Sequence, residues 1–246
     1  QAASHITGSG VRTLRSLVNK SLIGMRQGAR YDLHEVLRQF GVEQLERSGW
    51  GDRIRDAHSE YYLQLLSRLS GDLRGGRQKE ALGEIEADFQ NIRAAWNHAV
   101  EQKNKSLLDE AVEALFLYCD IRWRQRECAE LFKYALGVMA TSPEGEESLE
   151  YGRVLMKMGM LQSRYVRDDP SVGMGIKKGL EIVREYDSHP DTAFGLLALG
   201  HFAADVSQDI PEALGYFQAS LERYTELEDD YYLSLIHISE PTRLRR

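Results

Sequence analysis

The chain has 246 residues, of which 42% are hydrophobic and 28% charged, with five prolines and a net charge of −7. This composition is typical of a folded, helix-rich protein with one or two domains, and it excludes a disordered chain. The negative net charge argues against a protein that coats nucleic acid. The charge is uneven, because residues 1–30 carry basic side chains and no acidic one.

Cysteines and apolar runs indicate the compartment. Cys119 and Cys128 are the only cysteines, and their spacing matches no metal-binding or redox motif. We therefore expect free, mostly buried thiols in a reducing compartment. The longest apolar-leaning run covers residues 193–204, well short of the roughly 20 residues that a membrane span requires. With no signal peptide recognised, these features predict a cytoplasmic protein that does not contact a membrane.

The first organised segment, residues 14–40, predicts a helix, two short strands and a second helix. We expect the first helix over residues 11–20, strands over 21–25 and 30–33, and a turn at Gly28 between the strands. A helix followed by a two-stranded wing and another helix is the order found in the back half of a winged helix.

The start of the second helix carries a candidate capping box. Asp32 is placed to cap the helix, and Glu35 lies three residues later, where its side chain can reach back. His34 is then expected in the first helical turn. Unpaired N–H groups and the helix dipole attract anions there, phosphates above all, and a histidine adds a donor.

These residues also carry a resemblance to a known family. The text LVNKSLI, followed by YDLHEVLRQFG, resembles the winged-helix segment of STAND-class nucleotide-binding regulators, the NB-ARC-like switch proteins. In that family a Met-His-Asp triplet opens this helix, and its histidine contacts the β-phosphate of bound ADP. The resemblance implies that Leu33, His34 and Glu35 form the corresponding triplet, with His34 on the phosphate. On spacing alone, packing of His34 beside the wing is the favoured interpretation, and the surrounding text turns the interpretation toward the family.

The basic residues near the N-terminus allow a second interpretation. Arg12, Arg15 and Lys20 lie on or beside the first expected helix and are possible contacts to phosphate or DNA. An ordinary solvated or domain-facing charged surface explains them at least as well. The alternative function is therefore a DNA-binding winged-helix protein with a fused interaction array.

A run of helices is expected next. The helix over residues 52–70 has a stripe of Ile54, Ala57, Tyr61, Leu65 and Leu69, and glycines at 71, 75 and 76 are expected to end it. The stripe of the following helix, 78–102, consists of Ile85, Phe89, Ile92, Trp96 and Ala99. Its text EADFQNIRAAWNHAVE resembles the linker after the winged helix in bacterial STAND regulators. Further helices are expected over 106–119 and 125–139.

The sequence repeats itself beyond Pro143. An offset of 41 residues aligns Leu155 with Leu196, Met158 with Leu199, Gly159 with Gly200, Leu161 with Phe202, Pro170 with Pro211, Ile176 with Phe217, Leu180 with Leu221 and Glu181 with Glu222. Each unit predicts a helical hairpin with a glycine in its first helix and a proline at the start of its second. The second copy resembles a tetratricopeptide repeat (TPR), whose usual period is about 34 residues. We expect longer helices around residues 185–191 to absorb the difference.

The expected fold is all-α: a partial winged helix with a small β-wing, then an α-solenoid of TPR-like hairpins. The domains are expected at 1–48 for the C-terminal part of the winged helix, 49–104 for a helical linker, and 105–233 for the repeats. The clearest repeat copies cover 149–187 and 190–228. The tail 234–246 departs from the helical pattern, resembles translated adaptor sequence, and is expected to be non-native.

The expected function is regulatory rather than enzymatic. No Walker motif is present, so no cofactor is expected in this piece, while the resemblance implies ADP or ATP in a full-length protein with an NTPase domain upstream of Gln1. The repeats are expected to bind a protein or a small inducer in their groove, in transcriptional regulation. Nucleic acid is not expected to bind this piece alone. No metal site is indicated, because the histidines lack ligand clusters.

Overall fold

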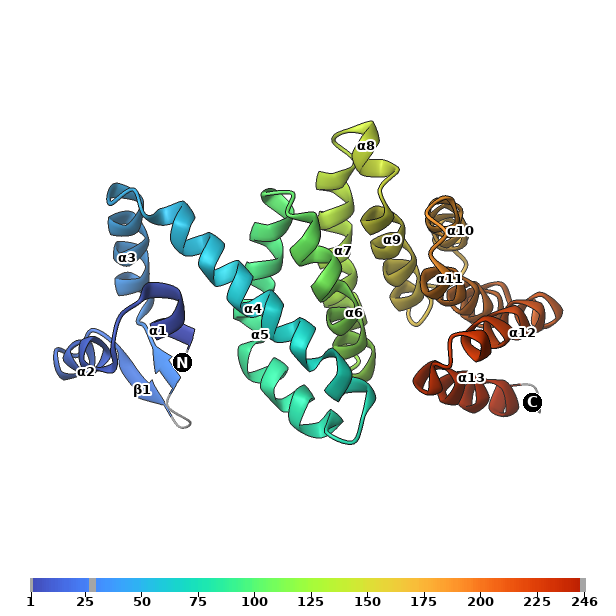
Figure 1. The fold of residues 1–246 in the computed structure, drawn as a ribbon, viewed down its shortest axis with the longest axis horizontal. Coiled ribbons are helices and arrows are strands. Elements are labelled where there is room, and N and C mark those ends of the chain that lie inside the picture. The colour runs from blue at the N-terminus through green and yellow to red at the C-terminus, as the bar shows by residue number, and fades with distance from the viewer. Residues whose placement is uncertain (1, 27–29, 244–246) are drawn as a thin grey trace.

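The computed structural model describes residues 2–26 and 30–243 of the chain. It is an all-α protein with one small sheet, and its helices follow one another along an elongated, curved arrangement (Figure 1). The N-terminal elements form a small unit at one end, and the helices from α4 onward form a continuous helical array. We call these two parts the N-terminal unit and the array.

From residue 11 onward, the N-terminal unit has the order of elements that the sequence predicts, and one further helix precedes them. It consists of α1 (Ala2–Thr7), α2 (Val11–Asn19), β1 (Gly24–Arg26), β2 (Arg30–Asp32) and α3 (Glu35–Arg47). The strands pair antiparallel, with Met25 opposite Tyr31. The turn expected at Gly28 lies outside the described residues.

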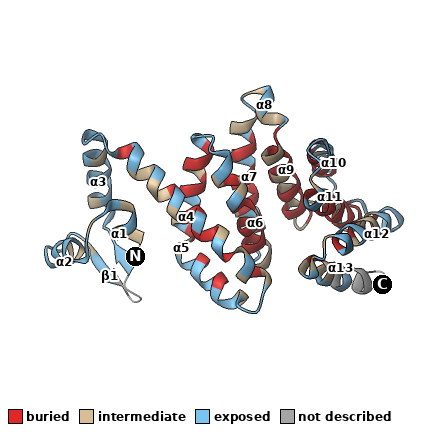
Figure 2. Ribbon diagram, in the orientation of Figure 1, coloured by how far each residue is buried: buried red, intermediate tan, exposed pale blue. Residues whose placement is uncertain are grey.

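No described residue between positions 2 and 50 is buried. Several large apolar side chains of this unit are instead exposed, including Met25, Val36, Phe40 and Trp50. Figure 2 shows the contrast with the array, where buried residues run along every long helix from α4 to α12. The N-terminal unit therefore lacks a hydrophobic core of its own, although its helices and strands are formed.

The first half of the array contains α4 (Gly51–Arg74), α5 (Gln78–Glu101), α6 (Lys105–Ile121), α7 (Gln125–Met139) and the short α8 (Pro143–Glu146). The predicted apolar stripe of α5 is confirmed, since all five of its residues are buried. The stripe predicted for α4 is only partly correct, because its first three members are half-buried. Gly71 does not end α4 as predicted: the helix continues to Arg74 and Gly75 is its C-cap.

The second half of the array continues as paired helices, as the repeat predicts. These are α9 (Leu149–Gln162), α10 (Pro170–Glu185), α11 (His189–Phe202) with a π-helical turn (Ala203–Ser207), α12 (Ile210–Glu226) and α13 (Asp230–Arg243). Asp169 and Asp209 cap α10 and α12 through their side chains. A proline lies in the first turn of each helix, where the backbone N–H that proline lacks would have no partner within the helix.

One packing contact recurs at the interval that the alignment gives. Gly159 faces Ile176 so closely that a Cβ would lie 2.4 Å from Ile176 Cγ1, and Gly200 faces Phe217, where the corresponding distance to Cδ1 is 2.6 Å. The glycine allows the two helices of each hairpin to approach. The predicted lengthening around residues 185–191 is wrong, because a short turn over 186–188 lies there; the longer connection is 163–169, within the hairpin.

Two further expectations are corrected. Residues 234–243 do not depart from helical structure but continue α13, and Ile236 is fully buried. Cys119 and Cys128 are not free thiols, because they form a disulfide with a Cα–Cα distance of 6.2 Å, and they therefore no longer support the expectation of a reducing compartment. The cysteines lie near the facing ends of α6 and α7, and the turn between these helices brings them together. Within the described residues, no helix is both long and apolar enough to cross a bilayer.

Candidate functional site

His34 lies at the junction of β2 and α3. It is the N-cap of α3 rather than a residue of its first turn, and its Nδ1 accepts a hydrogen bond from the Val36 N–H at 3.4 Å. The predicted capping box is therefore wrong: Asp32 belongs to β2 and Glu35 begins the helix. Since Nδ1 is the acceptor, the proton of a neutral imidazole lies on Nε2, which can donate outward from this exposed side chain.

The Glu35 side chain bonds to Arg38 within α3 and does not reach back to the N-cap of the helix. Its carboxylate accepts two hydrogen bonds from Arg38, at 2.8 and 2.6 Å, and these bonds lower the pKa of Glu35 to about 2. Leu33 is exposed beside His34. The three residues of the predicted triplet are thus adjacent and on the surface.

The candidate phosphate contacts from α2 are also at the surface. Arg12, Arg15 and Lys20 are all exposed. Since each side chain is accessible, neither the nucleotide nor the DNA interpretation is excluded by burial.

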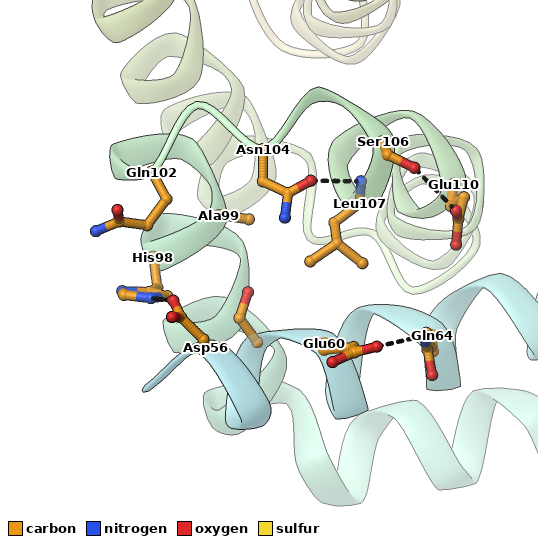
Figure 3. Close-up of a pocket in the computed structure, with 11 residues that line it drawn as sticks. Asp56, Glu60, Gln64, His98, Ala99, Gln102, Asn104, Ser106, Leu107 and Glu110 are labelled. Atoms are coloured by element: carbon orange, nitrogen blue, oxygen red, sulfur yellow. Dashed lines mark hydrogen bonds and ion pairs between the residues drawn. The ribbon is translucent and has the colours of Figure 1, made fainter. Parts of the chain in front are cut away.

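A cavity lies in the array, between α4, α5 and the start of α6 (Figure 3). It has a volume of about 670 Å³ and a polar lining. Its lining side chains come from Asp56, Ser59, Glu60, Gln64, His98, Ala99, Gln102, Asn104, Ser106, Leu107 and Glu110. We refer to it as the acidic pocket.

Hydrogen bonds fix several of the lining side chains. His98 Nε2 lies 2.8 Å from Asp56 Oδ1, Gln64 donates to Glu60 at 3.2 Å, and Ser106 donates to Glu110 at 3.2 Å. Asn104 accepts from the Leu107 N–H and so caps α6 at the pocket.

The pocket has an unbalanced negative charge. In the part of the chain that the structure describes, Asp56, Glu60 and Glu110 form no ion pair with a lysine or arginine, and His98 is the only basic residue in the lining. All three carboxylates are exposed, whereas the buried or partly buried Glu113, Asp191 and Asp120 of the array each have an arginine partner. Chemically, the pocket is suited to a ligand that carries an amine or a guanidinium group.

A second group of charged residues holds the array together. We call Arg74, Glu113, Lys157 and Tyr232 the ionic cluster; they come from α4, α6, α9 and α13. Glu113 accepts from Arg74 at 2.6 Å, from Tyr232 at 2.7 Å and from Lys157. Burial raises the pKa of Glu113, but the charges of Lys157 and Arg74 and the hydrogen bonds outweigh it and lower the pKa to about 2.

Further ion pairs lie next to the ionic cluster. Arg153 of α9 pairs with Asp109 of α6 and, at 2.7 Å, with Asp191 of α11. Arg74 also lies 3.3 Å from Asp229, which precedes α13. These ion pairs therefore link helices that are not consecutive along the chain: α4 with α6, α6 with α9, and α9 with α11.

Sequence reasoning missed both the acidic pocket and the ionic cluster. A signal for the cluster exists, because Lys157 is a lone charge in the apolar text VLMKMGML and its partner Glu113 is similarly placed in AVEALF. Charges on an apolar helix face need a partner. The pocket has no comparable signal, since its carboxylates lie on exposed helix faces.

Among the described residues, no group of three or more His, Cys, Asp or Glu side chains is arranged to hold a metal ion. His201 is buried in α11 against Phe217. Comparisons with known proteins give no match to a family model, to a curated protein or to a solved structure.

Proposed function

We propose that this chain is part of a nucleotide-switch regulator of the STAND class, in which a winged-helix unit is coupled to a TPR-like sensor array. The observation that carries the proposal is the β2–α3 junction, where an exposed His34 caps a helix in a unit that has no buried residue. A unit without a core is stabilised by packing against another surface. In this proposal that surface belongs to an upstream NTPase domain of the same chain, in a cytoplasmic regulator of transcription.

The proposed role of His34 is to bind the β-phosphate of ADP. Its Nε2–H donates to the phosphate while Nδ1 remains on the Val36 N–H, so that the imidazole is oriented by α3. The positive end of the α3 dipole favours the same anion. Leu33 and Glu35 flank the histidine, and the bound nucleotide holds the switch closed. ADP and ATP belong to the intact regulator rather than to this piece.

Replacing His34 with alanine, in a chain that carries the nucleotide-binding domain, is expected to weaken ADP binding. The change removes one donor to a charged acceptor, a loss of about 1.5–3 kcal/mol, or roughly ten- to a hundredfold in the ADP dissociation rate. Basal signalling should rise, because the contact exists only in the closed state. His189→Ala, which removes another exposed histidine, is the control. An unaltered dissociation rate with a lower melting temperature would show that His34 is a packing residue.

For the array, we propose that the acidic pocket takes the charged end of the inducer. The three carboxylates without a lysine or arginine partner support a ligand with a primary amine or guanidinium group, as part of either a small molecule or a peptide. Spermidine and a lysine-containing peptide are suitable probes, because they share this group but differ in size.

Replacing Glu60 and Glu110 with glutamine is expected to weaken probe binding about thirtyfold, since each of the two charge-assisted contacts contributes about 1 kcal/mol on an accessible surface. Isothermal titration calorimetry at two salt concentrations measures the effect, and the wild-type affinity should fall with salt. Glu84→Gln, an exposed carboxylate of α5 outside the pocket, is the matched control. Equal binding by the wild type and the double variant would remove the pocket from the proposal.

The second candidate function, DNA binding through Arg12, Arg15 and Lys20, is supported by their exposure. A fluorescence titration with duplex DNA separates the two. We expect little or no binding by this chain, whose net charge is −7. Submicromolar binding with a steep salt dependence, lost in the triple alanine variant, would instead support the DNA-binding function.

A further inference from the structure

Arg30 connects the N-terminal unit to the array. It opens β2, and its guanidinium reaches α5, where Nη1 donates to the Ala87 carbonyl at 2.6 Å and to Asp88 Oδ1 at 3.0 Å, while Nη2 donates to Asp88 Oδ2 at 2.7 Å. Asp88 is held in place by a further hydrogen bond from Asn91 at 3.0 Å. We call this bidentate contact and its carbonyl bond the clasp.

Few other contacts fix the N-terminal unit on the array. α1 packs on α4 through Ala2 and Ile6, and His5 lies against Tyr61 with a ring distance of 5.2 Å. The clasp is an ion pair between β2 and α5. The rest of the unit extends away from α5 (Figure 1).

The connection between α3 and α4 allows movement. It is short, covers residues 48–50, and contains Gly49 with a φ of +73°. Its brace, Glu46 to Arg55, is a pair of exposed side chains, and such pairs contribute little to stability. A rotation here moves α2, the β-hairpin and α3 as a group, unless the hairpin is held elsewhere.

We propose that the Arg30–Asp88 clasp is a conformational latch: when closed, it holds the β-hairpin against α5, and when open, it lets α2, the β-hairpin and α3 reorient about residues 48–50 while α1 stays packed on α4. Arg30 is four positions before His34 on the same segment, so the latch also fixes the direction in which the β2–α3 junction faces. The regulatory meaning of the latch rests on the proposed function. Its opening is a property of this chain alone and needs no nucleotide.

The strength of the clasp suits a contact that opens and closes. The Arg30 side chain is 44% exposed and that of Asp88 is 20% exposed, so solvent and salt weaken the attraction. The bidentate geometry and the bond to Ala87 make the clasp stronger than an ordinary surface pair. A contact of this strength can be displaced by a modest competing interaction.

The test measures the distance between spin labels on Gln39Cys of α3 and Glu84Cys of α5, by pulsed electron resonance in the full chain. The wild type should give one narrow distribution. Arg30→Ala should add a second population, with the open fraction rising about fivefold. Asp88→Asn should act in the same direction, and the exchanged pair Arg30→Asp with Asp88→Arg should restore most of the closed population. Added salt should open the wild type more than Arg30→Ala.

Arg68→Ala, an exposed arginine of α4, is the matched control and should leave the distribution unchanged. Unfolding of the array is checked by circular dichroism on each variant. A wild-type distribution in both Arg30→Ala and Asp88→Asn would overturn the latch. If only the nucleotide proposal fails, His34→Ala leaves the ADP dissociation rate unchanged. Arg30→Ala still changes the distance between the spin labels in that case.

Discussion

Replacing Glu113 with leucine is expected to lower the free energy of unfolding by about 3–5 kcal/mol, because it leaves buried cations without their counter-charge. The Lys157 side chain is only 4% exposed, and Glu113 is its ion-pair partner. Two aromatic rings also face the ammonium group, Phe194 at 4.1 Å and Phe116 at 5.2 Å. These cation–π contacts compensate only part of the lost carboxylate.

Chemical denaturation followed by circular dichroism measures this effect. Glu181→Leu, at an exposed position of α10, is the control and should change stability by less than about 0.5 kcal/mol. The double variant Glu113→Leu with Lys157→Met should recover much of the loss, since removing both charges avoids an unpaired one. A single variant as stable as the wild type would mean that the ionic cluster does not hold the helices together.

The lowered pKa of Glu113 predicts that stability depends on pH. The pKa of Glu113 is about 2 in the folded protein, below its ordinary value of 4.5. The folded state therefore gains stability from this group above pH 4.5 and loses it as the pH falls from 4.5 toward 2, by roughly 3 kcal/mol in all. Glu113→Gln should flatten the unfolding free energy over that acid range. An unchanged acid slope in this variant would assign the loss to other carboxylates.

The helices of the array could be predicted from the sequence more fully than the β2–α3 junction and the acidic pocket. Ile85, Phe89, Ile92, Trp96 and Ala99 recur at helical spacing, so the burial of one face of α5 follows from local pattern alone. The glycine contacts of the hairpins were likewise visible as aligned positions. The exact cap of α3 was not, because Asp32 satisfies the same local pattern but is taken up by pairing with β1.

Long-range contacts explain most of the remaining differences. Arg74 meets Asp229 across 155 positions of the chain, and no local periodicity predicts which helices meet at that distance. The acidic pocket is built from parts of α4, α5 and α6 that each resemble an ordinary solvated face. Cys119 and Cys128 were expected to be free thiols. One lies at the end of a helix and the other at the start of the next, and their spacing in the sequence does not show that the two side chains meet.

The repeated glycine contacts give the last prediction. Gly159→Ala is expected to destabilise the protein by about 1–3 kcal/mol, since the added methyl group would lie 2.4 Å from Ile176 Cγ1, and Ile176 is fully buried. Gly200→Ala should act similarly against Phe217, because the two glycines occupy aligned positions.

Gly215→Ala separates this packing effect from the general preference of helices for alanine. Gly215 lies within α12, and no atom lies within 4 Å of the added Cβ, so alanine there should stabilise the protein by about 0.5–1 kcal/mol. Opposite signs in thermal melting of Gly159→Ala and Gly215→Ala are the expected result. If both alanines stabilise, the helices of the hairpin do not approach closely at Gly159, and the aligned glycines have no shared packing role.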